Sequence, residues 1–280
     1  MTSSNSQVPT TILVLGGTGK TGRRIIKRLE AKGCPVRVGS RSAEIPFEWH
    51  DSTTWAPALH DVSSVYIAFY PDLAVPGAAA TIQSFVDQAV DSGVRHLVLL
   101  SGRGEPEAQQ CEQIVQNTGV DWTILRVSWF SENFSEAFLR DLIMDGTVAL
   151  PAGEIEEPFI SAEDIADVAT AVLTEPSHAG QLYELTGPRL MTFREAVGAI
   201  AQATGREVTY VPISIEAFVA ALTDQGIPAD FVALIHYLFD KVLDGHNAYL
   251  TDGVQRALGR APQDFVTYAQ RTAATGAWNS

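Results

Sequence analysis

A glycine-rich loop near the start of the chain is the feature that most constrains the fold. The apolar run TILVL at residues 11–15 predicts a strand, and the residues after the loop have the apolar spacing of a helix. Between them lies Gly16-Gly-Thr-Gly19-Lys-Thr-Gly22, a G-x-x-G-x-x-G loop. Glycines permit a tight turn and a close backbone approach to a ligand, and the free N–H groups of a helix N-terminus attract a pyrophosphate. This order of strand, loop and helix predicts a dinucleotide site.

The rest of the first half of the chain extends this unit into a parallel sheet. Residues 35–39 predict a second strand, and the crossover between the two strands should be right-handed. Further buried strands are expected at residues 65–69, 96–100 and 122–125, with helices at residues 77–92 and 105–118 between them. This alternation predicts an α/β fold with a Rossmann-type doubly wound parallel sheet.

The alternation ends after Arg126, where a different layer begins. We expect a dinucleotide-binding domain over residues 1–150. Residues 151–280 are expected to form a mixed segment with a smaller, mainly helical C-terminal substrate-binding lobe, packed with the first domain as one unit.

One helix of the second segment has clear signals at both ends. Thr192 and Glu195 match a capping box, and Gly205 predicts the end of the same helix. The alternating residues 207–211 then predict a strand.

The end of the second predicted strand indicates which dinucleotide binds. An NAD enzyme usually places an acidic side chain here against the ribose 2′-hydroxyl, but this chain has Ser40 and Arg41. A hydroxyl and a guanidinium suit a 2′-phosphate, so we expect NADP(H), the alternative being a solvated surface arginine. Asp51 is expected either near the adenine or as the cap of the following helix. A Walker A motif is rejected, because position 14 is Val14 and not the glycine that this motif needs.

Composition and charge exclude several classes of partner. The formal net charge of −14 would repel a phosphate backbone, so we expect no nucleic acid partner. No apolar run is long enough to span a bilayer, which predicts a soluble protein without a membrane partner. The six histidines show no ligand-like spacing, and no metal is predicted. The polar first ten residues are interpreted as a frayed tail, and Cys34 and Cys111 as thiols of a reducing compartment, which predicts a cytoplasmic location.

A series of motifs resembles the NmrA-like group of atypical short-chain dehydrogenases. The motifs are, in order, ILVLGGTGKTGRR, VRVGSRS, LVLLSGRG, DWTILR and GQLYELTGP, and they cover nearly the whole chain. The resemblance implies that the cofactor is held by Gly16, Thr18, Gly19, Lys20, Thr21, Gly22, Ser40 and Arg41. It also implies that Phe69, Tyr70 and Ser101 line the nicotinamide side. The chain is similar both to NAD(P)H quinone oxidoreductases and to ergot-alkaloid iminium reductases of the festuclavine synthase type.

The usual catalytic pair of short-chain dehydrogenases is not where this family would place it. The helix that would carry Tyr-x-x-x-Lys corresponds to residues 105–119, which contain neither residue type. Tyr237 and Lys241 have the right spacing and would share one helical face, but they lie in the C-terminal lobe, and we interpret the match as a coincidence. Ser101 and Tyr70 are therefore the candidate catalytic donors. The alternative is that their hydroxyls bind the nicotinamide amide or ribose.

Aromatic residues beyond the strand predicted at residues 122–125 could form a substrate wall. Trp129, Phe130 and Phe134 follow that strand, and Tyr237 is a further candidate; the alternative for all four is ordinary core packing. We expect an NADPH-dependent oxidoreductase acting on a hydrophobic electrophile such as a quinone, an imine or an enone. The alternative is a redox-sensing regulator that binds NADP(H) and acts through a protein partner, and the oligomeric state is left open.

Overall fold

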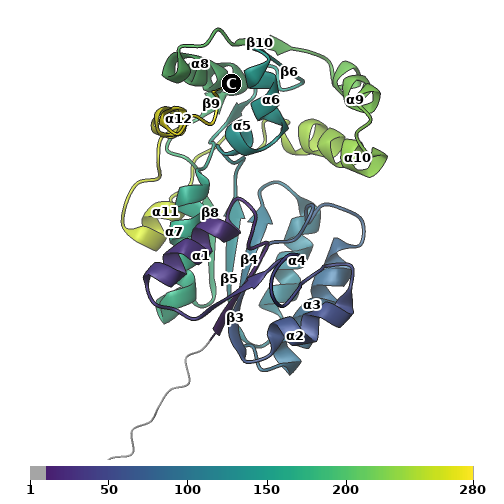
Figure 1. Cartoon of the computed structure of the whole chain (residues 1–280), viewed down its shortest axis with the longest axis vertical. Helices are drawn as coiled ribbons and strands as arrows, with labels where there is room; N and C mark the ends of the chain where they lie inside the picture. Colours follow the sequence, from purple (N-terminus) through teal and green to yellow (C-terminus); the bar gives the residue numbers. More distant parts are fainter. Residues whose placement is uncertain (1–10, 280) are drawn as a thin grey trace, which may run out of the picture. The chain divides into compact units, whose positions relative to one another are not determined.

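The computed structural model describes residues 11–279, so the expected frayed tail at residues 1–10 lies outside the described residues. The chain forms two compact units (Figure 1). Unit 1 comprises the residues up to Ser101, Pro106–Leu125 and Ile165–Tyr183, and unit 2 comprises Gly102–Glu105, Arg126–Asp164 and the residues from Glu184 onward. This division differs from the expected boundary at residue 150, because the chain returns to unit 1 at residue 165 and contributes another helix and most of a strand.

Unit 1 contains a six-stranded sheet with the order β2-β1-β3-β4-β5-β8. The strands are β1 (Thr11–Leu15), β2 (Val36–Gly39), β3 (Val62–Ile67), β4 (His96–Gly102), β5 (Asp121–Val127) and β8 (Gln181–Leu185). β1 pairs in parallel with β2 and β3, and β3 pairs in parallel with β4. The expected Rossmann-type sheet is confirmed, and the strand order reverses direction at β1, where such folds bind ligands.

Helices flank both faces of this sheet (Figure 1). They are α1 (Gly22–Ala31), α2 (Trp55–Leu59), α3 (Ala78–Asp91), α4 (Pro106–Gln116) and α7 (Ala162–Thr174). Alternate strand residues explain the two layers, because Leu13 and Leu15 pack in the same core as Phe85 of α3 and Val115 of α4. On the other face, an ion pair between Arg28 Nε and Asp167 Oδ1 (2.6 Å) joins α1 to α7.

Unit 2 is mainly helical, as expected, with two small two-stranded sheets. β6 (Thr147–Leu150) pairs in parallel with β10 (Thr209–Pro212), and β7 (Glu156–Glu157) pairs with β9 (Met191–Thr192) in antiparallel fashion. Its helices are α5 (Asn133–Glu136), α6 (Phe138–Met144), α8 (Phe193–Thr204), α9 (Ile215–Asp224), α10 (Ala229–Tyr237), α11 (Gly253–Leu258) and α12 (Phe265–Ala274). A π-helical turn at Leu238–Val242 continues α10.

The end signals predicted for α8 are confirmed. Thr192 Oγ1 accepts a hydrogen bond from the Glu195 N–H (3.1 Å), while Glu195 Oε2 accepts one from the Thr192 N–H (2.8 Å). Gly205 ends the helix with a φ of +69°, a left-handed conformation that favours glycine. The strand expected at residues 207–211 is present as β10, which begins two residues later than expected, at Thr209.

Candidate functional site

The glycine loop folds tightly back on itself between β1 and α1. The Gly19 N–H donates to the Gly16 carbonyl oxygen (2.8 Å), and the Gly17 N–H donates to the Gly39 carbonyl oxygen at the end of β2 (3.1 Å). A Cβ atom added at Gly22 would lie 2.2 Å from the Gly16 oxygen, which is far inside van der Waals contact. Only glycine at position 22 therefore allows this turn, and the turn places the first residues of α1 against the end of β1.

The N-terminus of α1 has no side-chain cap. The side chain of the N-cap residue Thr21 does not cap α1. The first turn of this helix contains no acidic residue. The Thr21 hydroxyl instead accepts a hydrogen bond from the buried Tyr66 hydroxyl (3.0 Å), and burial raises the pKa of Tyr66 well above its ordinary value. The Arg23 and Arg24 N–H groups donate to the carbonyl oxygens of Gly19 (3.2 Å) and Thr21 (3.1 Å), so an anion here would be held by the loop backbone and the positive end of the helix dipole.

Basic residues surround this helix start in an otherwise acidic chain. Five of the 19 lysines and arginines lie between positions 20 and 28, namely Lys20, Arg23, Arg24, Lys27 and Arg28. The Arg24 guanidinium donates to the Lys20 carbonyl oxygen (2.8 Å), which ties the helix to the loop. Local positive charge here offsets the net charge of −14 where a phosphate group would bind.

The residues after β2 lie next to the loop, because Gly39 accepts the hydrogen bond from Gly17. Arg41 has a 77% exposed side chain, and its Nε lies 3.8 Å from Glu48 Oε2, a loose ion pair that leaves the guanidinium accessible. Ser40 Oγ lies 3.5 Å from Ser42 Oγ. Asp51 caps the short helical turn Ser52–Thr54, since its Oδ1 accepts from the Thr53 N–H (3.1 Å) and hydroxyl (2.6 Å). Of the two roles expected for Asp51, the structure therefore shows the helix cap.

The three residues expected on the nicotinamide side follow the ends of neighbouring strands. Ile67 of β3 pairs with Leu99 of β4, so Phe69 and Ser101 lie at the same level, two residues further along each strand. Phe69 packs against Trp49 with ring centroids 4.9 Å apart, whereas Tyr70 is 62% exposed. The loop reaches the same sheet edge, since a Cβ at Gly16 would lie 3.2 Å from Ala68 Cβ.

Ser101 makes a contact that the sequence analysis missed. Its hydroxyl donates to Glu112 Oε1 of α4 at 2.6 Å, and both residues are buried. A signal for Glu112 exists in the sequence, because it interrupts the buried stripe formed by Ala108, Cys111 and Val115 on α4. A glutamate within an apolar stripe indicates a buried polar partner.

The aromatic candidates lie in unit 2 and have different surroundings. Phe134 is fully buried, and its ring centroid lies 5.4 Å from that of Phe159 and 5.2 Å from that of Phe265. Phe134 is therefore a core residue. Trp129 is partly buried, with its ring 5.2 Å from that of Phe239. Phe130 forms an isolated parallel bridge with Ile160.

The Tyr237 and Lys241 pair does not share an α-helical face. α10 ends at Tyr237, and Lys241 belongs to the π-helical turn, whose wider spacing changes the direction of side chains four residues apart. Lys241 Nζ pairs with Asp240 Oδ2 (3.0 Å). The expectation of a shared helical face is therefore wrong.

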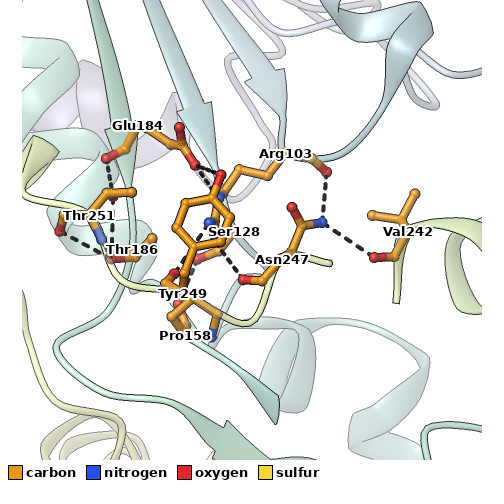
Figure 2. A network of polar contacts seen from close by, with 9 residues as sticks. All are labelled: Arg103, Ser128, Pro158, Glu184, Thr186, Val242, Asn247, Tyr249 and Thr251. Carbon is orange, nitrogen blue, oxygen red and sulfur yellow. Dashed lines mark hydrogen bonds and ion pairs between the residues drawn. The ribbon is translucent and has the colours of Figure 1, made fainter. Parts of the chain in front are cut away.

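A second polar cluster, which the sequence analysis also missed, is centred on Arg103 in unit 2 (Figure 2). Arg103 Nε donates to Glu184 Oε1 (2.7 Å), and its terminal nitrogens donate to the carbonyl oxygens of Asn247 (3.2 Å) and Tyr249 (3.3 Å). The guanidinium carbon lies 4.2 Å from the centre of the Tyr249 ring, and the Tyr249 hydroxyl donates to Glu184 Oε1 (2.8 Å). Arg103 thus fixes residues 244–251, which we call the strap.

Glu157 is a buried carboxyl group close to this cluster. Its side chain is 1% exposed, and neither carboxyl oxygen has a hydrogen-bond partner within residues 11–279. Burial, together with the nearby charge of Asp244 of the strap, raises its pKa to about 8 against the opposing influence of the Arg103 charge. Glu157 is therefore held in its protonated form at neutral pH.

The comparisons with known proteins agree with the geometry of unit 1. A family model described as NAD(P)H-binding matches residues 16–176. Festuclavine synthase I of Penicillium roqueforti is 33% identical over 284 residues, which cover 93% of this chain and 97% of that protein. Prestalk A differentiation protein A of Dictyostelium discoideum is 30% identical over 278 residues, covering 93% of this chain and 92% of that protein.

A solved structure shows the same fold. The NADPH-dependent quinone oxidoreductase of Escherichia coli, complexed with NADPH, superposes with a TM-score of 0.75 at 21% identity, covering 93% of this chain and 99% of that one. In the part of this chain that the structure describes, no helix has the length and apolarity needed to cross a membrane.

Proposed function

The chain belongs to the NAD(P)H-binding family, and from this premise we propose that it is an NADPH-dependent oxidoreductase that reduces a hydrophobic, electrophilic small molecule. The resemblance to NmrA-like atypical short-chain dehydrogenases is confirmed. The relatives support the class of NAD(P)H-dependent oxidoreductases. The substrate class is our proposal: a quinone, an iminium ion or an enone.

The observation that carries the proposal is the glycine cradle at the β1–α1 turn. Gly22 closes against the Gly16 carbonyl oxygen at a separation that no side chain permits, and the helix that starts there has no side-chain cap. A turn without a ligand would gain stability from a side-chain cap, which Thr21 does not supply because its hydroxyl is bound to Tyr66. These features fit the pyrophosphate of a dinucleotide.

Two features support NADPH over NADH. The exposed Arg41 follows β2, at the place where NAD enzymes carry an acidic residue against the ribose. A guanidinium forms paired hydrogen bonds with a phosphate, and Ser40 adds a hydroxyl beside it. Nearby Glu48 is only loosely paired with Arg41, so it does not occupy the guanidinium fully.

The substrate classes follow from the groups that the site offers. When bound, NADPH supplies a hydride. A quinone or a preformed iminium ion accepts hydride without a strongly positioned acid, so holding the two reactants in the right orientation would provide most of the rate. The hydroxyls expected at the sheet edge belong to Ser101, which is bound to Glu112, and to the exposed Tyr70.

Binding and turnover measurements test this function separately. NADPH and NADH are titrated into the purified protein, and NADPH absorbance is then followed with a panel of quinones, cyclic iminium ions and enones. We expect tighter binding of NADPH and consumption of NADPH with at least one class. Tight binding without consumption across the panel would contradict the oxidoreductase and favour the regulator, for which a protein partner would then be sought. Absence of dinucleotide binding would contradict both.

A further inference from the structure

The hydrogen bond between Ser101 and Glu112 has a direction. The Ser101 hydroxyl donates to Glu112 Oε1 at 2.6 Å, a distance typical of an O–H donor bound to a carboxylate. The two residues are 2% and 3% exposed, so water competes little for this bond. A serine hydroxyl has one proton and two lone pairs. Because its proton is bound to Glu112, Ser101 Oγ offers only lone pairs to a third group.

The position of Ser101 limits what that third group can be. Ser101 follows Leu99 of β4 by two residues, at the edge of the sheet where the glycine loop ends β1 and Phe69 follows β3. In open parallel sheets, ligands bind outside this carboxyl edge, at the point where the strand order reverses. That point lies at β1 here, and Ser101 lies at the same carboxyl edge of the sheet, on β4, two strands away from β1.

We propose that Glu112 is a positioning residue that fixes Ser101 as a hydrogen-bond acceptor, and that Ser101 accepts from the carboxamide NH2 of the nicotinamide. This inference rests on the proposed binding of NADP(H). It assigns Ser101 to cofactor binding and leaves Tyr70 as the hydroxyl donor at this edge.

A dinucleotide without the carboxamide donor tests the inference by binding alone. In the 3-acetylpyridine analogue of NADP⁺, a methyl group replaces the NH2. Titration calorimetry gives the Kd of NADP⁺ and of this analogue for each variant. We expect Ser101→Ala to weaken NADP⁺ binding about tenfold, the effect of one net hydrogen bond, and to leave analogue binding unchanged.

Glu112→Gln tests the direction of the hydrogen bond. A glutamine here can accept from the Ser101 hydroxyl through Oε1 or donate to Ser101 Oγ through its NH2, so the direction of the hydrogen bond is no longer fixed. We expect a loss of NADP⁺ affinity that does not exceed the loss in Ser101→Ala. The double variant should lose no more than Ser101→Ala, because both changes act on one contact.

A matched control separates this role from a structural one. Thr123 on β5 is also a buried hydroxyl, and it donates to the His178 carbonyl oxygen at 2.9 Å. Thr123→Val should lower the melting temperature without changing the ratio of the two Kd values. Equal weakening of NADP⁺ and analogue by Ser101→Ala would overturn the inference. If Glu112→Gln fails to fold, the ratio of the Kd values of NADP⁺ and the analogue in Ser101→Ala still tests the inference. Failure of the wild-type protein to bind either dinucleotide would instead refute the proposed function, and the inference with it.

Discussion

The Arg103 guanidinium and the Glu184 carboxylate are joined by a 2.7 Å hydrogen bond, with only 2% of the arginine side chain exposed. A buried arginine is stable only when its donors are used, and Glu184, Asn247 and Tyr249 together use them. The residues that accept these bonds lie 81 to 146 positions from Arg103 in the sequence. Within unit 2, this one side chain therefore connects the segment Gly102–Glu105, Glu184 and the strap.

Replacement of Arg103 by alanine should destabilise the protein strongly. It removes the partner of Glu184 and the donors that hold the strap, and breaking a buried ion pair costs about 3 to 5 kcal/mol. Urea denaturation should show this loss, and hydrogen exchange should show faster exchange at residues 244–251. Arg194→Ala is the matched control, because Arg194 pairs with Glu154 at the surface, and its midpoint should not change. Equal midpoints for the two variants would refute the role of Arg103.

Glu157 should make stability depend on pH. Its folded-state pKa of about 8 lies above the ordinary value of 4.5, so the folded state retains a proton that the unfolded state loses between these two values. Stability should therefore fall as pH rises from about 4.5 to about 8.

Glu157→Gln provides the comparison, because glutamine has nearly the same shape and does not ionise. Denaturation of the two proteins should give equal stability near pH 4.5. Above pH 8 the variant should be more stable, by roughly 5 kcal/mol for a shift of this size. A difference that stays constant across the whole range would show that Glu157 ionises normally.

Gly22→Ala should weaken dinucleotide binding strongly. The new Cβ would meet the Gly16 carbonyl oxygen at 2.2 Å and force the turn open, which removes the cradle at the start of α1. We expect the Kd of NADPH to rise at least tenfold. Gly198→Ala is the control, because a Cβ there has no neighbour within 4 Å and the residue lies inside α8. That variant should bind normally and gain up to about 1 kcal/mol of stability. Normal NADPH binding by Gly22→Ala would contradict the site.

Arg41→Glu should change the choice of cofactor. If its guanidinium binds the 2′-phosphate, the charge reversal should weaken NADPH binding about a hundredfold and NADH binding much less. Arg95→Glu makes the same change in charge at an exposed position just before β4. Arg95 lies at the amino end of this strand, away from the glycine loop, so this variant should change the binding of neither NADPH nor NADH. If Arg41→Glu weakens the binding of NADPH and NADH equally, Arg41 does not bind the 2′-phosphate.

Features with local sequence signals were predicted well. The strand at residues 11–15, the glycine loop and the capping box of α8 each depend on a few consecutive residues, and the structure contains all three. The sequence pattern could not separate Phe134 as a core residue from Phe134 as part of a substrate wall, because both roles need an apolar ring at that place. The structure surrounds it with other aromatic rings.

Features that depend on distant residues were not predicted. The division in the structure differs from the expected boundary at residue 150, because the chain leaves unit 1 after Leu125 and returns at Ile165, which no composition change marks. Nothing near Arg103 in the sequence indicates Glu184 or Asn247 as partners. Glu157 looks like a surface residue beside Glu156, and only the structure shows that it is buried.

Transfer of a labelled hydride tests the central claim most directly. The protein is incubated with NADPH deuterated at C4 and with whichever iminium ion or enone of the panel it consumes, and the product is examined by mass spectrometry. An NADPH-dependent reductase should place one deuterium on the carbon that is reduced, at a rate that Gly22→Ala lowers and Gly198→Ala does not. Product without deuterium from either C4 position, or equal rates in the two variants, would contradict hydride transfer at this site.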